Sequence, residues 1–493
     1  MAKKETQDKR AQVQRSKEKS DLGITADKDD FSEWFTQLMI KADLADYTEV
    51  SGCMVFKPAS YNIWEKIKEE CDKEFKKIGI QNCYFPLFIP EKLFALEKEH
   101  VKGFSPEVAW VTEAGGTKLN ERLAVRPTSE TIMYPSYAKW IRSWRDLPIK
   151  YNQWNNVVRW EFSHPVPFFR TREFLWNELH TCVATEKEAM AEGKQILDIY
   201  SDVCENSMAL YGIVGKKTEK EKFAGGVASW KLHYILPSGR IIEGSCFHHD
   251  GQNFSKVYNI KFLDKDEKEQ YVWQNTYAIS TRMLGTMFAI HSDEKGLILP
   301  PKIASHQIVI IPILFEDTKD KVLKKAKEVS EKLSQFNALI DDRENYKPGF
   351  KFNEWELKGI PVRIEIGPKD IEKNEVIIVR RDTNEKKAVK INNLSKEIPK
   401  IMDSIQKSLF EKSKKLFREK VEKARTLKEL KSLIESKKVG IVPLCKNVEC
   451  EDMLKSETKG AKAVFISEEK VKSEKCIICN KKADYLVYAG KVY

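Results

Sequence analysis

The spacing of apolar residues predicts the secondary structure of the first 300 positions. Over residues 60–78 an apolar residue recurs every three or four positions, which predicts one buried face of a helix that Gly79 ends. Residues 80–89 form a short apolar and aromatic run, which predicts a buried strand. Residues 185–211 have a helical pattern, and residues 230–300 alternate in short stretches with glycine turns, which is typical of antiparallel strands.

A different pattern follows. β-branched runs over residues 308–313, 362–366 and 376–379 predict strands, and an apolar stripe over residues 322–336 predicts a helix. Strands that alternate with helices are typical of a small α/β domain. An amphipathic helical stretch, rich in lysine and glutamate, is predicted over residues 408–438.

These patterns divide the chain into four segments. With 493 residues the chain is too long for one compact core, and the proline pair at 300–301 is a natural boundary. We expect an α+β multidomain protein with a charged, flexible arm over residues 1–30, a domain of antiparallel strands over 31–302, an α/β domain over 303–402 and a small cysteine-containing α+β domain over 403–493.

Composition and charge add three constraints. Apolar residues make up 41% and charged residues 32% of the chain, as in globular proteins with a charged surface. No apolar run is long enough to span a bilayer, and the charged N-terminal segment lacks the apolar core of a secretory signal, so we expect the cytosol. The formal net charge of +11 is compatible with a polyanionic partner such as RNA.

Four cysteines cluster near the C-terminus as two close pairs, Cys445 with Cys450 and Cys476 with Cys479. Two such pairs suit a closed tetrahedral zinc site with four thiolate ligands. A closed site leaves no open position for a substrate, so the zinc ion would be structural. The alternative is four reduced thiols that bind no metal.

Three polar clusters carry candidate chemistry. In residues 126–130 an arginine, two hydroxyls and a carboxylate lie at a predicted strand-to-helix transition, where they could hold an ammonium group or only cap the helix. In the second cluster Arg159 and Glu161 are expected on one face of a strand, across a proline-containing loop from residues 170–176. Its arginines could clamp a triphosphate or form a ladder of surface ion pairs. The third is Arg282, whose charge opposes the dipole of the helix it begins and so favours an anion or a surface ion pair.

In this order along the chain, these clusters resemble the motifs of class II aminoacyl-tRNA synthetases, most closely those of the prolyl-tRNA synthetases. Residues 126–130 resemble the proline-pocket signature of that family, and residues 159–176 resemble its motif 2. Residues 248–254 resemble its proline-pocket strand, and residues 348–359 resemble the signature of its anticodon-binding domain. A C-terminal zinc domain occurs in the archaeal and eukaryotic branch of that family.

The resemblance implies ATP-dependent attachment of proline to its tRNA in two steps, through prolyl-adenylate. Proline would be held by Thr128, Glu130, Arg159, Trp176 and His248, with Phe104 and Glu107 on a covering loop. ATP with Mg²⁺ would be bound by Arg159, Glu161, Arg170, Phe174, Glu243, Cys246 and Arg282, of which Arg159, Arg170 and Arg282 would act in catalysis. The anticodon would be read by Glu356, Arg363 and Lys369. The resemblance also implies a homodimer across residues 60–90, and neither a membrane nor DNA as a partner.

Several positions on the ATP side depart from the pattern of the family it resembles. Glu243, Ser245, Cys246 and Phe247 stand where that family usually has Gln, Gly, Thr and Ser, and its motif 3 glycine is Ala278 here. The upstream strand, residues 229–232, lacks the usual threonines. These changes leave the predicted proline contacts intact. They leave undecided which residues would contact ATP.

Two other functions stay open at this point. A synthetase-like protein that no longer aminoacylates could serve as a tRNA-binding or regulatory module. A class II enzyme for another amino acid such as threonine would need a zinc ion in its active site, for which residues 159–178 offer no convincing ligand set.

The resemblance further implies that Tyr493 turns back toward the catalytic domain and that its carboxylate meets a basic or amide-rich spot there.

Overall fold

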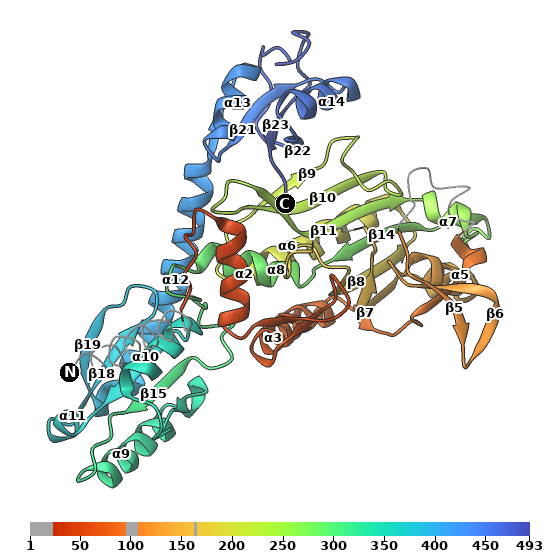
Figure 1. The fold of residues 1–493 in the computed structure, drawn as a ribbon. Coiled ribbons are helices and arrows are strands. Elements are labelled where there is room, and N and C mark those ends of the chain that lie inside the picture. Colours follow the sequence, from red (N-terminus) through yellow and green to blue (C-terminus); the bar gives the residue numbers. More distant parts are fainter. Residues whose placement is uncertain (1–22, 95–106, 162–164) are drawn as a thin grey trace.

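The computed structural model describes residues 23–94, 107–161 and 165–493. Three parts are visible in Figure 1: a large body built on a long sheet, a smaller α/β part at its lower left, and a C-terminal part above it. The long helix α12 (Leu394–Lys420) runs from the α/β part to the C-terminal part. No helix among the described residues is both long and apolar enough to cross a membrane.

The largest sheet has 11 strands in the order β20-β21-β23-β22-β9-β10-β11-β14-β8-β7-β3. All neighbours are antiparallel except β3 with β7 and β20 with β21. Its seven strands from the large body are β3 (Gln81–Asn82), β7 (Ile149–Val158), β8 (Glu173–Val183), β9 (Ile213–Lys216), β10 (Ala228–Ile235), β11 (Ile241–Gly251) and β14 (Trp273–Ala278). The predicted antiparallel domain is therefore confirmed.

Helices cover one face of this sheet and bury the main core. The predicted helix over residues 60–78 is α3 (Pro58–Lys77), and Gly79 follows it with φ +80°, the left-handed conformation that glycine adopts most readily. Its buried face includes Trp64, Ile67 and Phe75. Among the described residues, the other helices of the large body are α2 (Phe31–Lys41), α5 (Glu130–Trp140), α6 (Glu186–Asn206), α7 (Asn253–Val257) and α8 (Arg282–His291), with a 3₁₀ turn η1 (Trp144–Asp146).

Three small sheets lie beside the large one. They are β1 (Ala45–Tyr47) with β2 (Met54–Phe56), β12 (Lys261–Leu263) with β13 (Glu269–Tyr271), and β4 (Phe88–Pro90), β6 (Thr117–Val125) and β5 (Trp110–Ala114). The buried strand predicted over residues 80–89 is wrong as one element, because the run is divided between β3 and β4. Only part of it is buried: Ile89 is inaccessible, whereas Tyr84 is 69% exposed.

The α/β part has a five-stranded sheet in the order β16-β15-β17-β18-β19. Its elements are β15 (Ile308–Pro312), α9 (Lys319–Lys332), η2 (Ser334–Phe336), β16 (Leu339–Ile340), α10 (Pro348–Leu357), β17 (Val362–Ile366), α11 (Pro368–Glu372), β18 (Glu375–Arg380), β19 (Lys386–Lys390) and η3 (Ile391–Asn393). The apolar stripe predicted over residues 322–336 contributes to the core of the α/β part, since Val322, Ala326 and Val329 are fully buried against the sheet. The predicted α/β domain is confirmed.

The C-terminal part extends the large sheet. It contains β20 (Val421–Lys423), α13 (Leu427–Glu435), β21 (Val439–Leu444), α14 (Val448–Glu457), β22 (Lys462–Ile466) and β23 (Tyr485–Gly490). A single residue pair, Ile466 with Lys216, joins β22 to β9 and so makes the two sheets continuous. The helical stretch predicted over residues 408–438 is in fact the end of α12, a short strand and α13. Because α12 crosses residue 402, the division of the chain there stays a prediction.

Candidate active site

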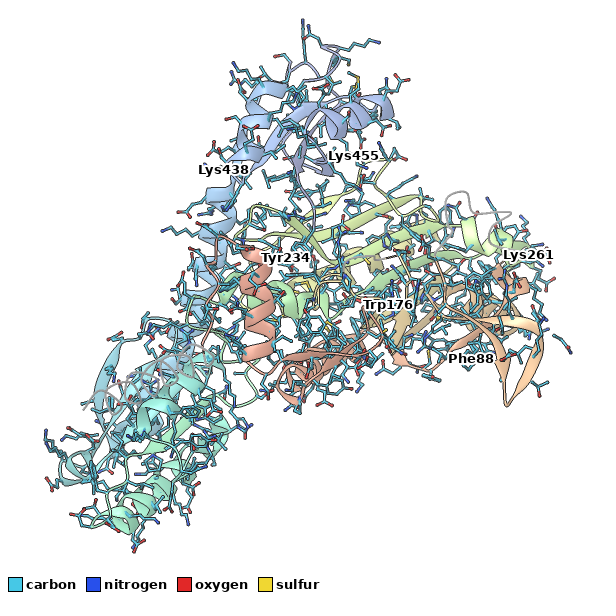
Figure 2. All side chains as sticks on the ribbon, viewed as in Figure 1. Phe88, Trp176, Tyr234, Lys261, Lys438 and Lys455 are labelled. Atoms are coloured by element: carbon cyan, nitrogen blue, oxygen red, sulfur yellow. The ribbon has the colours of Figure 1, made fainter. Side chains whose placement is uncertain are left out.

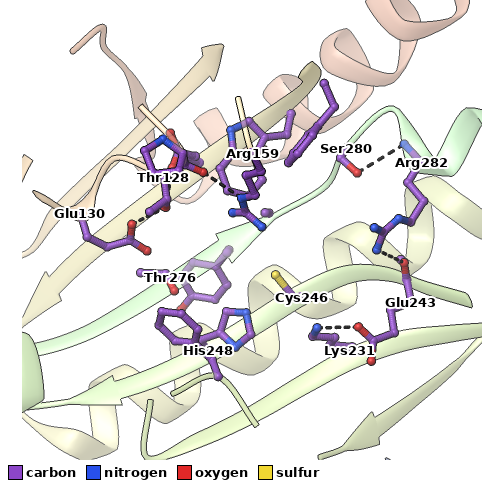
Figure 3. Close-up of a pocket in the computed structure, with 18 of the residues that line it drawn as sticks. Thr128, Glu130, Arg159, Lys231, Glu243, Cys246, His248, Thr276, Ser280 and Arg282 are labelled. Carbon is purple, nitrogen blue, oxygen red and sulfur yellow. Dashed lines mark hydrogen bonds and ion pairs between the residues drawn. The ribbon is translucent and has the colours of Figure 1, made fainter. Parts of the chain in front are cut away.

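One cavity of about 480 Å³ opens on the large sheet and gathers most of the predicted site residues. Its walls come from β8, β10, β11 and β14, from the segment that follows β7, from the starts of α5 and α8, and from the segment that joins β9 to β10. In Figure 3 Thr128 and Glu130 lie at one end, Arg282, Glu243 and Lys231 lie at the other, and Arg159 lies between them. Trp176, on β8, lies near the middle of the whole molecule in Figure 2.

The turn before α5 holds a carboxylate toward one end of the cavity. The Thr128 hydroxyl donates to Glu130 and lies 3.1 Å from Oε1 of Glu178. The cap alternative is confirmed in position, since α5 begins at Glu130 with Ser129 as its N-cap residue, but it is wrong about the hydrogen bond, because no side chain caps the helix. Instead, the Ser129 hydroxyl and backbone N–H both donate to Glu178. The turn is thus tied to the sheet rather than to its own helix.

Glu178 anchors this end of the cavity, and sequence reasoning missed it. Its Oε2 also accepts hydrogen bonds from Asn155 at 2.7 Å and Gln153 at 3.1 Å. Burial raises the pKa of Glu178, but the neighbouring His180, Ser129 and Asn155 outweigh burial and lower it to about 2. The carboxylate is therefore charged and fully engaged.

Glu130, Glu178 and His180 have ligand atoms within 4.8 Å of one another, a spacing that could hold a metal ion. The sequence analysis predicted that residues 159–178 offer no convincing set of metal ligands. That prediction did not consider Glu178 together with Glu130 and His180, which lie outside that range. Because both oxygens of Glu178 accept protein hydrogen bonds, we interpret the group as a support for the turn at Thr128 and not as a metal centre.

Arg159 is held in the middle of the cavity by backbone and ring contacts. Its Nε donates to the Pro127 carbonyl at 2.9 Å, and its guanidinium lies 5.1 Å from the Trp176 ring and 5.5 Å from the Phe174 ring. The prediction that Arg159 and Glu161 share a strand face is wrong, since β7 ends at Val158. Arg159 and Glu161 nevertheless both line the cavity.

Arg282 begins α8 and contributes a second cation to the same cavity. Its Nε donates to the Phe169 carbonyl at 3.3 Å and its Nη1 to the Glu243 carbonyl at 3.5 Å. Burial lowers its pKa, and the nearby Glu243 carboxylate opposes that shift. The guanidinium therefore lies in the cavity wall and not in a surface ion pair, which favours the anion alternative.

Glu243 is shared between two lysines, of which sequence reasoning placed Lys231 on the ATP side, within residues 229–232, and missed Lys217. Its Oε1 accepts from Lys217 at 2.6 Å and its Oε2 from Lys231 at 2.7 Å. Burial raises the pKa of Glu243, but Lys231 and Lys217 outweigh burial and hold it well below its usual value. Lys231 lines the cavity, whereas the Lys217 side chain is 1% exposed and lies behind it.

His248 and Cys246 extend from the next part of β11 into the cavity. The His248 Nδ1 lies 2.7 Å from the Ser229 hydroxyl, and its ring lies 4.9 Å from that of Phe223. Burial and the nearby Lys231 lower the pKa of His248 to about 3, so the ring is uncharged at neutral pH. Burial raises the pKa of the Cys246 thiol, although Lys231 acts against this.

Three predicted residues lie outside the described cavity wall. Arg170 is close enough to Arg282 to lower its pKa, but it is not among the lining residues. Glu107 is exposed, and its carbonyl accepts a hydrogen bond from the Trp160 N–H at 2.9 Å. Phe104 lies outside the described residues. Conversely, the cavity contains Glu178, His180, Phe223, Thr276 and Ser280, which were not predicted.

The four clustered cysteines meet in the C-terminal part. The Sγ atom of Cys445 lies 3.5 Å from that of Cys450 and 3.7 Å from that of Cys479, and all four sulfurs lie within 4.8 Å of one another. A tetrahedral site with Zn–S bonds of about 2.3 Å places its sulfurs roughly 3.8 Å apart. The geometry therefore fits a zinc ion.

The residues expected to read the anticodon lie on the α/β part. Glu356, at the end of α10, accepts from Lys295 at 3.1 Å. Arg363, on β17, pairs with Glu365 at 2.9 Å and lies over the Phe352 ring. Lys369 lies on α11.

Comparisons with known proteins agree with these observations. The family model for the class II tRNA synthetase core domain (G, H, P, S and T) matches residues 110–291. The model for the anticodon binding domain matches residues 307–401, and the model for the prolyl-tRNA synthetase C-terminal domain matches residues 427–493.

Relatives that match nearly the whole chain are named for one activity. A proline–tRNA ligase of Natranaerobius thermophilus is 45% identical over 459 residues, which cover 92% of this chain and 94% of that protein. The proline–tRNA ligase of Ruminiclostridium cellulolyticum is 46% identical over 472 residues, which cover 95% and 98%. The crystal structure of prolyl-tRNA synthetase from Cryptosporidium parvum, complexed with halofuginone and AMPPNP, has a TM-score of 0.92 and 42% identity, and the match covers 96% of this chain and 100% of that chain. These relatives and this solved structure are named for proline and not for threonine, and they give no support to a regulatory module without activity. A charged cavity on an antiparallel sheet, an anticodon-binding domain and near full-length relatives lead to one conclusion: the chain belongs to the prolyl-tRNA synthetases, the enzymes that attach proline to its tRNA.

Proposed function

We propose that the two ends of the cavity hold the two substrates of prolyl-adenylate formation. The amino acid would occupy the end at Thr128 and Glu130, walled by Trp176 and His248, with Phe104 and Glu107 on a covering segment. An anionic Glu130 beside the Thr128 hydroxyl suits the secondary ammonium of proline. The neutral ring of His248 suits the apolar pyrrolidine better than a charged one would.

ATP would occupy the opposite end. Glu161 would accept from the adenine amino group, and Phe174 and Arg282 would lie on the two sides of the base. Arg159 would hold the α-phosphate and the prolyl carboxylate, and Arg170 would hold the leaving pyrophosphate with Mg²⁺. The central position of Arg159, within reach of both ends, supports this division.

Attack of the prolyl carboxylate on the α-phosphate needs no protein nucleophile. The residues would act by alignment and by stabilising charge on the transferred group, with Arg159, Arg170 and Arg282 as the catalytic cations. Transfer of proline to the 3′ end of the tRNA would follow at the same site.

The departures on the ATP side assign different roles to Glu243 and Lys231. Because the Glu243 carboxylate is already paired with two lysines, we propose that it orders cations and does not itself contact the nucleotide. Lys231 would face the phosphates or ribose, opposite Cys246 on the paired strand β11.

For the tRNA we propose that Glu356, Arg363 and Lys369 read anticodon guanines. Arginine and lysine can donate to guanine O6 and N7, whereas glutamate can accept from N1 and N2. These residues would need to leave their present partners, Lys295 and Glu365, or share them with the RNA.

We also propose a structural Zn²⁺ on the four cysteines, residence in the cytosol, and a homodimer across α3 and the segment that follows it. Exposed aromatic side chains support the dimer surface, since Tyr61, Tyr84 and Phe88 leave apolar area uncovered. The domain limits at residues 30, 302 and 402 remain part of this proposal.

The observation that carries the proposed site is the single cavity that places Arg159 between Glu130 and Arg282. Proline-dependent exchange of pyrophosphate into ATP tests it, with threonine, alanine and no amino acid as controls. Exchange that requires proline, and that falls in Glu130→Gln and Arg159→Ala, is the expected result. Full exchange in both variants would contradict the assignment.

A further inference from the structure

The segment that joins β9 to β10, residues 217–227, connects the cavity to the C-terminal part. We call it the pocket loop. Glu221, Lys222, Phe223 and Ala224 on this loop line the cavity. The Phe223 N–H donates to the Ser229 hydroxyl at 3.0 Å, and that hydroxyl also contacts His248 at 2.7 Å. The loop is thus bonded to the wall of the proposed proline site.

The outer side of the same loop is held by helix α14 and strand β22. The Thr218 hydroxyl donates to Oε2 of Glu451 at 3.0 Å, and both residues are buried. Lys220 pairs with Asp452, the next residue of α14. These contacts join residues more than 200 positions apart, so they exist only in the folded chain.

A third contact comes from β22. The Lys462 ammonium donates to Oε2 of Glu221 at 3.0 Å, and Glu221 itself lines the cavity. Close packing supports the join, because the Phe465 ring occupies the space where a Cβ of Gly215 would lie, 2.1 Å from its nearest atom. The C-terminal part therefore touches a cavity-lining residue through Lys462, and it contacts the neighbouring Thr218 and Lys220 through Glu451 and Asp452.

The cysteine cluster includes a residue of the first turn of α14. Cys450 is the third residue of that helix, and Glu451 follows it directly. The helix is short, 10 residues, so its position depends on tertiary contacts more than on its own helical stability. A metal ion bound to Cys450 and the other three cysteines would fix the helix, and with it the Glu451 carboxylate.

From these contacts we propose that Glu451 is a positioning residue for the amino-acid end of the cavity, and that metal occupancy of the four cysteines is coupled to proline binding through α14 and the pocket loop. The inference rests on the proposed proline site at Thr128, Glu130 and His248. Glu451 touches no substrate: it acts through Thr218 and the loop that carries Phe223.

The first experiment alters the contact between Thr218 and Glu451 and leaves the cysteines unchanged. We expect Glu451→Ala to raise the proline KM roughly 5- to 10-fold with little change in kcat, because a buried hydrogen bond is lost and the loop is freed. Glu451→Gln keeps an acceptor oxygen and should restore the KM. Lys455→Ala, an exposed change on the same helix, is the matched control. Thr218→Val removes the partner hydroxyl from the other side if Glu451→Ala fails to fold.

The second measurement does not depend on activity. Amide hydrogen exchange in residues 217–227 should be faster in Glu451→Ala, with the metal content per chain unchanged. An unchanged proline KM together with unchanged loop exchange would overturn the proposal, as would equal effects of Lys455→Ala. Failure of the proposed proline site is a separate outcome, recognised by a Glu130→Gln variant that binds proline normally.

Coupling is reciprocal, so the ligand should also act on the metal. We expect saturating proline with a non-hydrolysable ATP analogue to slow the removal of zinc from the full chain by a chromogenic chelator. The same ligands should lose this effect in Glu451→Ala. Equal release rates with and without ligands in the unaltered protein would contradict the coupling.

Discussion

The ring of Tyr493 packs against the ring of Phe169, with 4.4 Å between the ring centroids. The Tyr493 N–H also donates to the Ile241 carbonyl at 3.1 Å, which places this residue beside β11. The predicted return of Tyr493 to the catalytic part is therefore confirmed, while a role for its carboxylate stays a prediction. Figure 1 marks this end of the chain near β9 and β10, at the centre of the molecule.

This contact predicts an effect of Tyr493 on the nucleotide end of the cavity. The Phe169 carbonyl accepts from Arg282, so loss of the Tyr493 ring should loosen that arginine. We expect Tyr493→Ala to raise the ATP KM several-fold, whereas Tyr493→Phe, which keeps the ring, should match the unaltered enzyme. An ATP KM that is equal in all three proteins would show that the contact is only structural.

Arg159→Ala should slow prolyl-adenylate formation about 10²- to 10³-fold, because it removes an oriented donor from the developing charge on the α-phosphate. Single-turnover formation of the adenylate at saturating proline and ATP measures this directly. Arg145→Ala, at an exposed arginine of the same body, serves as the control. Survival of the rate within about twofold would remove Arg159 from the catalytic set.

Glu130→Gln should weaken proline far more than ATP, since it keeps the shape of the side chain and removes the charge that pairs with the ring ammonium. A loss of roughly 1.5–3 kcal/mol, or about 10- to 100-fold, is expected in the proline KM. The same chemical change at the exposed Glu113 should have no effect. A parallel rise in the ATP KM would mean that the substitution disturbs the whole cavity through Thr128.

Lys231→Met should raise the ATP KM without unfolding the protein, because Lys217 still neutralises the Glu243 carboxylate. Lys217→Met should act mainly on stability, since its side chain is buried behind the cavity. Exchange kinetics at saturating proline and thermal unfolding separate the two effects. If Lys231→Met leaves the ATP KM unchanged, Lys231 is part of the structural ion pair only.

Glu356→Gln should reduce charging of the tRNA and leave tRNA-independent pyrophosphate exchange intact, because α10 lies on the α/β part and not at the cavity. Glu372→Gln, an exposed change on α11, the next helix along the chain, controls for a general loss of charge. A fall in exchange would indicate that Glu356 acts structurally through Lys295, its partner at 3.1 Å.

Local spacing in the sequence was sufficient for features that depend on near neighbours in the chain. The repeat of α3, the α/β alternation and the paired cysteines all follow from the geometry of helices, strands and metal ligands over short separations. The resemblance then supplied the residues at 128, 130, 159, 176, 248 and 282, which the structure gathers in one cavity.

Only the tertiary structure decided which side chains meet across the sheet. Glu178 accepts a hydrogen bond from the turn at Ser129, 49 positions away. The register of β10 and β11 brings Lys231 next to Glu243. The division of residues 80–89 into two strands follows from pairing with different partners, β7 and β6, which no local pattern encodes. Thr218 and Glu451 lie 233 positions apart, and their contact depends on how the C-terminal sheet docks against β9. Spacing along the chain limits what each element can be, but the free energy of burial and of satisfying buried polar groups selects the partners, and that selection involves the whole fold.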